Sequence, residues 1–206
     1  MKVIGIACSP RQQGNTEFLI REALAAAKEA GAEETEIVTV ANKRILPCNG
    51  CECCLKTGKC IIDDDMQEIY PKLLDADGII IGTPVYFWGI CGLAKVFIDR
   101  TYCLATGHLA IILGPEARIK MKSRRGKDLR NKVGGIIVVT ARVGGTTVVN
   151  QVSDFFRMHR MIEAGSAIAF AYHKGEASKD EQGLNEARGT GRAVVRTIKQ
   201  REKLEG

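Results

Sequence analysis

Short, continuous runs of apolar residues alternate along this chain with longer segments in which apolar residues recur every three or four positions. Continuous runs are typical of strands that are buried on both faces of a parallel sheet. They cover residues 2–8, 36–41, 79–82, 132–140 and 164–172. The segments between them have helical spacing and predict helices at about 17–30, 63–74, 92–103, 146–161 and 185–203. This alternation predicts an α/β fold with a doubly wound parallel sheet.

Five strands in 206 residues fit the flavodoxin-like strand order 2-1-3-4-5 better than the longer dinucleotide-binding fold with two halves. In such sheets ligands bind at the carboxyl ends of the strands, near the switch point between the first and third strands. Loops rich in polar, aromatic or glycine residues follow the first, third and fourth strands, and we expect them to form one shared site. We predict a single domain over residues 1–206, with a cysteine-rich insertion at about 43–65 after the second strand.

Composition and charge change this picture little. Hydrophobic residues make up 45% and charged residues 26% of the chain, which is ordinary for a soluble globular protein. No apolar run is long enough for a membrane span, and the chain begins with a strand rather than a signal peptide, so we expect a cytoplasmic protein. The net charge of +6 is concentrated partly in residues 118–127. No aromatic residue is interleaved there for base stacking, so we interpret this stretch as a solvated basic loop rather than a nucleic-acid site.

The connection after the second strand contains five of the eight cysteines within thirteen residues. Four of them follow a C-x2-C-x2-C-x5-C spacing: Cys48, Cys51, Cys54 and Cys60. Short gaps let the backbone curl around one centre, and grouped thiolates suit a soft metal centre, above all an iron–sulfur cluster. Zinc sites usually pair two C-x2-C units across a longer gap, but zinc and free redox-active thiols remain alternatives. Cys53 falls outside the spacing, unless a shifted register exchanges it for Cys54.

The first loop leads from a buried strand into a helix N-terminus, where backbone amides and the helix dipole favour an anion. Ser9, Asn15 and Thr16 add hydroxyl and amide donors, and Arg11 adds a guanidinium that suits phosphate. The loop matches neither the G-x-G-x-x-G nor the G-x4-G-K-[ST] fingerprint. We expect Asn15 or Thr16 to be the N-cap of this helix, and the alternative is an ordinary loop in which capping is their only role.

Three consecutive aromatic residues follow the third strand, in the run Pro84-Val85-Tyr86-Phe87-Trp88. Aromatic residues beside an anion site suggest a wall for a planar ring, while packing in the core or between subunits is the alternative. After the fourth strand, Gly144 and Gly145 would permit close approach of the backbone to such a ring, or they form a simple turn.

The histidines at positions 108, 159 and 173 are scattered along the chain. We find no nucleophile–base pattern around them and expect them on the surface or on helix faces. The chemistry is therefore expected to be carried by bound cofactors.

Two of these loops resemble the NAD(P)H-dependent FMN reductase family of flavodoxin-like proteins. They are Ser9-Pro10-Arg11-x-x-Gly14-Asn15-Thr16, and Pro84-Val85-Tyr86 followed by Leu93-Ala94-Lys95. The compact cysteine segment, with Asp63-Asp64-Asp65-Met66 behind it, resembles the iron–sulfur flavoprotein branch of that family. The resemblance is strong over the first half of the chain and holds in outline over the rest.

This resemblance implies one FMN per chain and one [4Fe-4S] cluster on Cys48, Cys51, Cys54 and Cys60. It also implies dimers paired into tetramers, with the cluster near a flavin and neighbouring subunits helping to build the site. By the same likeness, the motif around Gly14 binds the FMN phosphate, and two further groups of residues border the ring. The phosphate contacts are Ser9, Arg11, Asn15 and Thr16, and the ring contacts are Pro84, Val85, Tyr86, Phe87, Trp88, Gly144 and Gly145.

The functional hypothesis is electron transfer between a one-electron donor such as ferredoxin and a small two-electron acceptor, through the cluster and FMN. The first alternative is an NAD(P)H-dependent FMN or quinone reductase that has no cluster. The second is a zinc-containing protein that binds nucleic acid through its basic stretch. We expect no membrane partner and a homodimer or homotetramer.

Overall fold

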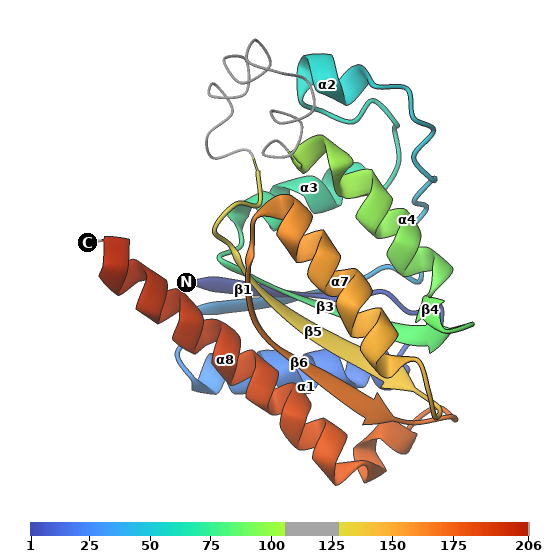
Figure 1. Ribbon diagram of the computed structural model, residues 1–206, viewed down its shortest axis with the longest axis vertical. Helices are drawn as coiled ribbons and strands as arrows, with labels where there is room; N and C mark the ends of the chain where they lie inside the picture. The colour runs from blue at the N-terminus through green and yellow to red at the C-terminus, as the bar shows by residue number, and fades with distance from the viewer. Residues whose placement is uncertain (106–127, 206) are drawn as a thin grey trace.

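Five parallel strands form the centre of the structure, in the order β2-β1-β3-β5-β6 (Figure 1). This computed structural model describes residues 1–105 and 128–205. The strands are β1 Lys2–Ala7, β2 Glu34–Thr39, β3 Gly78–Tyr86, β5 Val133–Thr140 and β6 Ile162–Phe170. A short sixth strand, β4 (Gly89–Ile90), turns back antiparallel on β3. Because β5 and β6 are the fourth and fifth parallel strands, the expected flavodoxin-like order is confirmed.

Helices cover both faces of the sheet: α1 and α8 lie on one face, and α3, α4 and α7 lie on the other (Figure 1). Their bounds are α1 Asn15–Glu29, α2 Cys53–Thr57, α3 Met66–Asp75, α4 Gly92–Arg100, α7 Gly145–His159 and α8 Glu181–Glu205, with 3-10 turns η1 Thr101–Leu104 and η2 Glu176–Lys179. The N-cap of α1 is Gly14, with no side-chain cap, so the expected cap at Asn15 or Thr16 is wrong. The short α2 inside the cysteine connection was not predicted.

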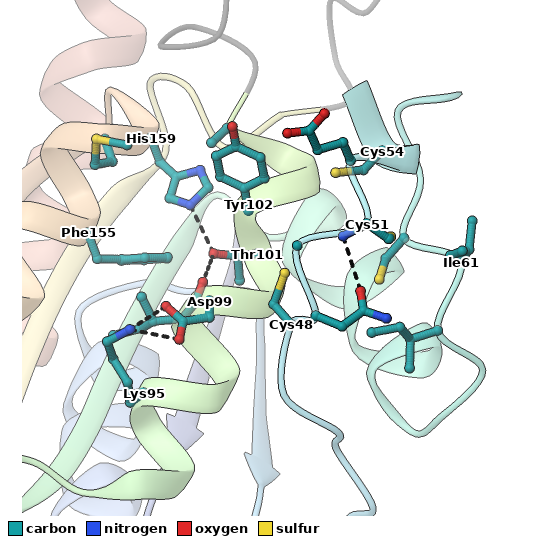
Figure 2. Close-up of a pocket in the computed structure, with 18 of the residues that line it drawn as sticks. Cys48, Cys51, Cys54, Ile61, Lys95, Asp99, Thr101, Tyr102, Phe155 and His159 are labelled. Atoms are coloured by element: carbon teal, nitrogen blue, oxygen red, sulfur yellow. Dashed lines mark hydrogen bonds and ion pairs between the residues drawn. The ribbon is translucent and has the colours of Figure 1, made fainter. Parts of the chain in front are cut away.

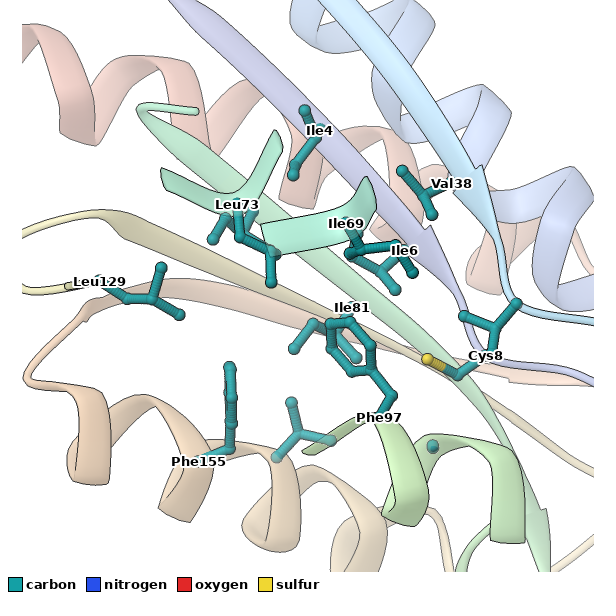
Figure 3. Close-up of a cluster of buried hydrophobic side chains, with 14 of the residues drawn as sticks. Ile4, Ile6, Cys8, Val38, Ile69, Leu73, Ile81, Phe97, Leu129 and Phe155 are labelled. Carbon is teal, nitrogen blue, oxygen red and sulfur yellow. The ribbon is translucent and has the colours of Figure 1, made fainter. Parts of the chain in front are cut away.

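Apolar side chains of the central strands point alternately to the two faces. In β3, Ile79 and Ile81 belong to the core under α3, α4 and α7, whereas Ile80 belongs to the core under α1 and α8. Figure 3 shows the first of these cores, where Phe97 of α4 and Phe155 of α7 lie beside the strand residues. Because helices cover both faces, the first seven positions of β3 are all buried, which explains the continuous apolar runs in the sequence.

The segment between η1 and β5 carries three features of the sequence that lie outside the described residues: His108, the apolar run at 109–113 and the basic stretch at 118–127. Within the described ranges, no helix combines the length and the apolar character that crossing a membrane requires. A single domain over residues 1–206 stays a prediction.

Candidate functional site

The carboxyl ends of the parallel strands surround two hollows of about 210 Å³ and 660 Å³. Both are lined by Val85, Ala141 and Tyr172, so we treat them together as one strand-end groove. The smaller hollow is also lined by Ser9, Arg11, Asn15, Thr16, Pro84 and Tyr86, and the larger one by Phe87 and Trp88. The structure therefore brings residues of all three predicted loops together at the expected edge of the sheet.

The first loop is held in shape by its own side chains. The Arg11 amide donates a hydrogen bond to Ser9 Oγ (3.2 Å), and the Gln13 amide donates one to the Glu17 carboxylate (2.8 Å). Burial alone would raise the pKa of Glu17, but its hydrogen bonds from Arg21 and from the Gln13 amide outweigh burial and lower it. Glu17 therefore stays ionised and fixes the left-handed backbone of Gln13, whose φ is +50°.

Asn15 and Arg11 lock the first loop onto the loop that follows β6. Asn15 Nδ2 donates to the His173 carbonyl (2.8 Å), and its Oδ1 accepts from the amides of Gly175 (2.8 Å) and Ala177 (3.3 Å). Arg11 Nη1 donates to the carbonyl of Tyr172 (3.1 Å). The Asn15 side chain is thus committed to protein partners, and together these contacts fix Tyr172 in the groove.

Tyr172 is a groove residue that sequence reasoning missed. It follows β6 at the same edge of the sheet, and 68% of its surface is exposed. The rule that selected the other loops applies to it equally, because it lies just beyond the carboxyl end of a parallel strand. Ala141, Arg142 and Val143 of the loop after β5 also line the groove, although only the two glycines of that loop were predicted.

The aromatic residues lie at the tip of the hairpin between β3 and β4. The third strand runs to Tyr86, four residues further than expected, so that only Phe87 and Trp88 form the turn. Both have left-handed backbones, with φ of +50° and +62°, and their rings meet edge to face with centroids 5.6 Å apart. Phe87 is 95% exposed and Trp88 61% exposed, which excludes a core role for them within one chain.

The three predicted glycines do not line the groove among the described residues. Gly144 lies directly behind it, because a Cβ atom there would be 2.9 Å from Val85 Cγ1 and 3.3 Å from Trp88 Cα. Its φ of +86° also favours glycine. Gly145 faces Ile168 instead, and Gly14 lies against the Arg11 backbone. Nine of the twelve predicted cofactor contacts therefore line the groove itself.

The four cysteines of the C-x2-C-x2-C-x5-C spacing line one cavity of about 660 Å³ between the cysteine segment, η1 and α7 (Figure 2). Tyr102, Phe155 and His159 contribute to its wall, whereas Cys53 does not. Burial, followed by the neighbouring thiols of Cys60 and Cys48, raises the pKa of Cys54. Thiolates brought this close repel one another, and a cationic metal centre between them would relieve that repulsion.

In the part of the chain that the structure describes, no three His, Cys, Asp or Glu side chains converge closely enough to hold one metal ion. A single zinc ion draws its ligands to about 2.3 Å. A four-iron cluster spreads its four thiolates more widely than one ion does. The four cysteines around the cavity supply a set of thiolates, which suits a soft metal centre.

The cysteine cavity and the strand-end groove share no lining residue among the described residues. In Figure 1 the cysteine segment with α2 lies at the top, far from the carboxyl ends of β5 and β6. Gln151 of α7 links the cavity to the hairpin: it lines the cavity, and its Oε1 accepts a hydrogen bond from the amide of Ile90 (3.0 Å). Within one chain, the two sites are neighbours through α7 but remain separate.

His159 lies buried at the end of α7, with Nε2 3.0 Å from Thr101 Oγ1. Burial lowers its pKa from 6.5 to about 4, so the native protein keeps it neutral while the unfolded chain protonates below about pH 6.5. This side chain should therefore stabilise the fold at neutral pH and lose that contribution as the pH falls from 6.5 towards 4.

We predict that this single group costs the protein roughly 2 kcal/mol of unfolding free energy between pH 7 and pH 5. The substitution His159→Asn keeps a hydrogen-bonding group near Thr101 and removes the titration. Urea unfolding of both proteins at pH 7 and pH 5 measures how much unfolding free energy each one loses between the two pH values. Equal losses in the wild type and the variant would contradict the prediction.

Comparison with known proteins identifies the family that the chain matches. Residues 1–175 match the family model described as NADPH-dependent FMN reductase. An iron–sulfur flavoprotein of Methanocaldococcus jannaschii is 41% identical over 209 residues, which cover 97% of this chain and 98% of that protein. An iron–sulfur flavoprotein of Methanosarcina thermophila is 36% identical over 167 residues, covering 80% of this chain and 78% of that protein.

Solved structures show the same fold at lower sequence identity. A flavone reductase superposes with a TM-score of 0.72 at 24% identity over 98% of this chain, which spans 64% of the length of that protein. A flavodoxin from the domain Archaea superposes with a TM-score of 0.57 at 11% identity, covering 97% of this chain and 99% of that protein.

Proposed function

Because the chain belongs to the NADPH-dependent FMN reductase family and to its iron–sulfur flavoprotein branch, we propose that it transfers electrons through FMN and a [4Fe-4S] cluster. It is an FMN-dependent oxidoreductase of the electron-transfer flavoprotein kind. In the proposed reaction a one-electron donor such as ferredoxin supplies electrons and a small two-electron acceptor receives them. When bound, FMN exchanges one or two electrons and the cluster exchanges one.

The observation that carries the cluster proposal is the lining of one cavity by all four cysteines of the C-x2-C-x2-C-x5-C spacing. We assign Cys48, Cys51, Cys54 and Cys60 as the ligands. All four cysteines line this cavity, so their positions exclude none of them as a ligand.

For FMN we propose that the smaller hollow takes the phosphate and the larger one takes the ring. Ser9, Arg11 and Thr16 line the smaller hollow, at the N-terminus of α1 where the helix dipole favours an anion. Asn15 contributes by fixing the loop after β6. Val85, Trp88 and Tyr172 offer apolar and aromatic surface to the ring, and Gly144 lets the backbone of α7 lie close behind Val85.

The separation of the cavity from the groove within one chain supports assembly of several copies. We propose a homodimer or homotetramer in which the cysteine cavity of one copy lies near the groove of another. The exposed rings of Phe87 and Trp88 would then be covered by a neighbouring copy, which accounts for apolar surface that one chain leaves in water. A cytoplasmic location is part of the same proposal, because free thiols and clusters suit a reducing compartment.

The test is the content of iron, acid-labile sulfide and FMN per chain in protein purified without oxygen. About four irons and four sulfides beside one FMN, the composition of one cubane, is the expected result. FMN without iron would favour the alternative, an NAD(P)H-dependent FMN or quinone reductase. Stopped-flow reduction separates the two further, because the proposal expects the flavin to bleach with reduced ferredoxin and the alternative expects it to bleach with NADPH.

A further inference from the structure

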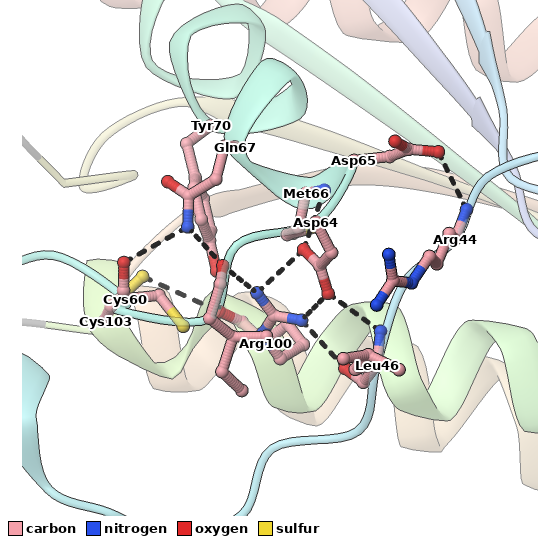
Figure 4. Close-up of polar contacts among 11 residues, drawn as sticks. Arg44, Leu46, Cys60, Asp64, Asp65, Met66, Gln67, Tyr70, Arg100 and Cys103 are labelled. Carbon is pink, nitrogen blue, oxygen red and sulfur yellow. Dashed lines mark hydrogen bonds and ion pairs between the residues drawn. The ribbon is translucent and has the colours of Figure 1, made fainter.

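A buried ion pair lies beneath the cysteine segment, between Asp64 and Arg100, the last residue of α4 (Figure 4). Both side chains are fully buried. Arg100 Nη1 and Nη2 each donate to one carboxylate oxygen of Asp64, in the two-pronged geometry that makes such pairs strong and directional. Burial alone would raise the pKa of Asp64, but the hydrogen bonds from Arg100 and from two backbone amides outweigh it and lower that pKa.

The pair holds the two ends of the cysteine segment, residues 48–60, at one point. Arg100 Nη1 donates to the carbonyl of Leu46 (2.8 Å), just before Cys48, and Nη2 reaches the carbonyl of Ile62 (3.5 Å), just after Cys60. Asp64 accepts a hydrogen bond from the Leu46 amide (2.8 Å). The chain just before and just after the segment, which we call its two arms, is therefore bound to the same ion pair.

The fourth proposed ligand, Cys60, is held in this network as well. Gln67 Nε2 donates to the carbonyls of Cys60 (3.1 Å) and Ile62 (2.6 Å). Behind them, the Arg100 carbonyl accepts hydrogen bonds from Tyr70 Oη (2.8 Å) and from the Cys103 thiol (3.6 Å). Cys103 therefore takes part in this network as a hydrogen-bond donor to the Arg100 carbonyl.

A contribution to the stability of the fold does not by itself explain this pair. Buried ion pairs are often no more stabilising than apolar residues of the same size, because desolvation offsets the attraction. Arg100 Nε is also buried and has no hydrogen-bond partner among the described residues. What the pair provides is position and charge. It fixes both ends of the cysteine segment, and it places the Arg100 guanidinium, paired with the Asp64 carboxylate, within electrostatic reach of Cys60 in a medium of low polarity.

We propose that Arg100 and Asp64 are positioning residues for the iron–sulfur cluster: they clamp the two arms of the cysteine segment, and their opposite charges shift the reduction potential of the cluster in opposite directions. This inference rests on the proposed function. Reduction adds negative charge to the cluster, so the guanidinium favours the reduced state and the carboxylate opposes it. Removing one partner leaves the other charge uncompensated.

The experiment compares Arg100→Met and Asp64→Asn with the wild type, all purified without oxygen. The control is Arg188→Met, which breaks the ion pair of Arg188 with Glu22 between α8 and α1, on the other face of the sheet. Iron release to a chelator, FMN content and the cluster midpoint potential by electron paramagnetic resonance are measured. Loss of an outer contact commonly weakens metal retention about 10- to 100-fold.

We expect both cysteine-segment variants to release iron about 10- to 100-fold faster than the wild type while keeping their FMN. The midpoint potential should fall in Arg100→Met and rise in Asp64→Asn, and the control should match the wild type. Wild-type release rates in both variants, or potentials that shift in the same direction, would overturn the inference. A merely structural role would move both potentials alike.

If Arg100→Met does not fold, which its loss of FMN would reveal, Arg100→Lys takes its place. Lysine keeps the charge but cannot hold both arms, so we expect fast iron release with a potential near the wild-type value, and slow release would overturn the clamp. A wild-type protein that contains FMN but neither iron nor sulfide is a different result, because it refutes the proposed function itself.

Discussion

Replacing Cys54 by alanine is expected to give a protein that keeps its FMN and loses nearly all of its iron and acid-labile sulfide. Cys54 lines the cysteine cavity, is partly buried and packs against the core under α3 and α4. Its removal leaves three thiolates around the cavity, and a cubane held by four cysteines then has an open corner. Since the strand-end groove shares no described residue with the cavity, flavin binding should not change. Metal analysis and the visible spectrum measure the two cofactors in one sample.

Cys53→Ala is the matched control for this substitution. Cys53 is the adjacent residue in α2 and lies outside the cavity lining, with its thiol against that of Cys51. It should keep the full iron content. The reverse pattern, with iron lost from Cys53→Ala and kept in Cys54→Ala, would mean that the register is shifted and Cys53 is the ligand. Iron retained in both variants would refute the four-cysteine assignment.

The fold could be predicted from the sequence because its strands are buried on both faces. Ile79, Ile80 and Ile81 form one continuous run, since neighbouring residues point into two different cores. Parallel strands also end at one edge of the sheet, so that loops far apart in sequence, such as those at Ser9 and Pro84, could be expected to meet. These are rules of period and topology, and they need no knowledge of individual side-chain contacts.

The parts that could not be predicted depend on contacts between distant residues. Asp64 reads in the sequence as an acidic residue at the start of a helix, and it does accept the amide of Met66 there (3.0 Å). Its partner Arg100 is 36 residues away, at the end of a helix where a basic residue is ordinary. Nothing in either local pattern indicates a buried pair. The hairpin that exposes Phe87 and Trp88 could not be predicted either, because β4 has only two residues, too few to give a strand pattern in the sequence.

Arg11→Gln is expected to weaken the binding of FMN about tenfold to a hundredfold and to leave the binding of riboflavin unchanged. A hydrogen bond to a charged group contributes about 1.5–3 kcal/mol, and riboflavin lacks the phosphate that would receive it. Titration of the flavin-free protein with each ligand, followed by flavin fluorescence, gives both dissociation constants. Arg196→Gln removes the same charge from the exposed side of α8 and should change neither constant.

The comparison of the two flavins separates a direct contact from an indirect one. Arg11 Nη1 already donates to the Tyr172 carbonyl, so Arg11 could act by holding Tyr172 rather than by binding phosphate. In that case Arg11→Gln would weaken FMN and riboflavin equally, because Tyr172 lines both hollows of the groove. The variant Gly144→Ala shows what equal weakening of FMN and riboflavin binding looks like. Its new methyl group would press on Val85 and on the Trp88 backbone, a contact that deforms the ring site and should weaken both flavins alike.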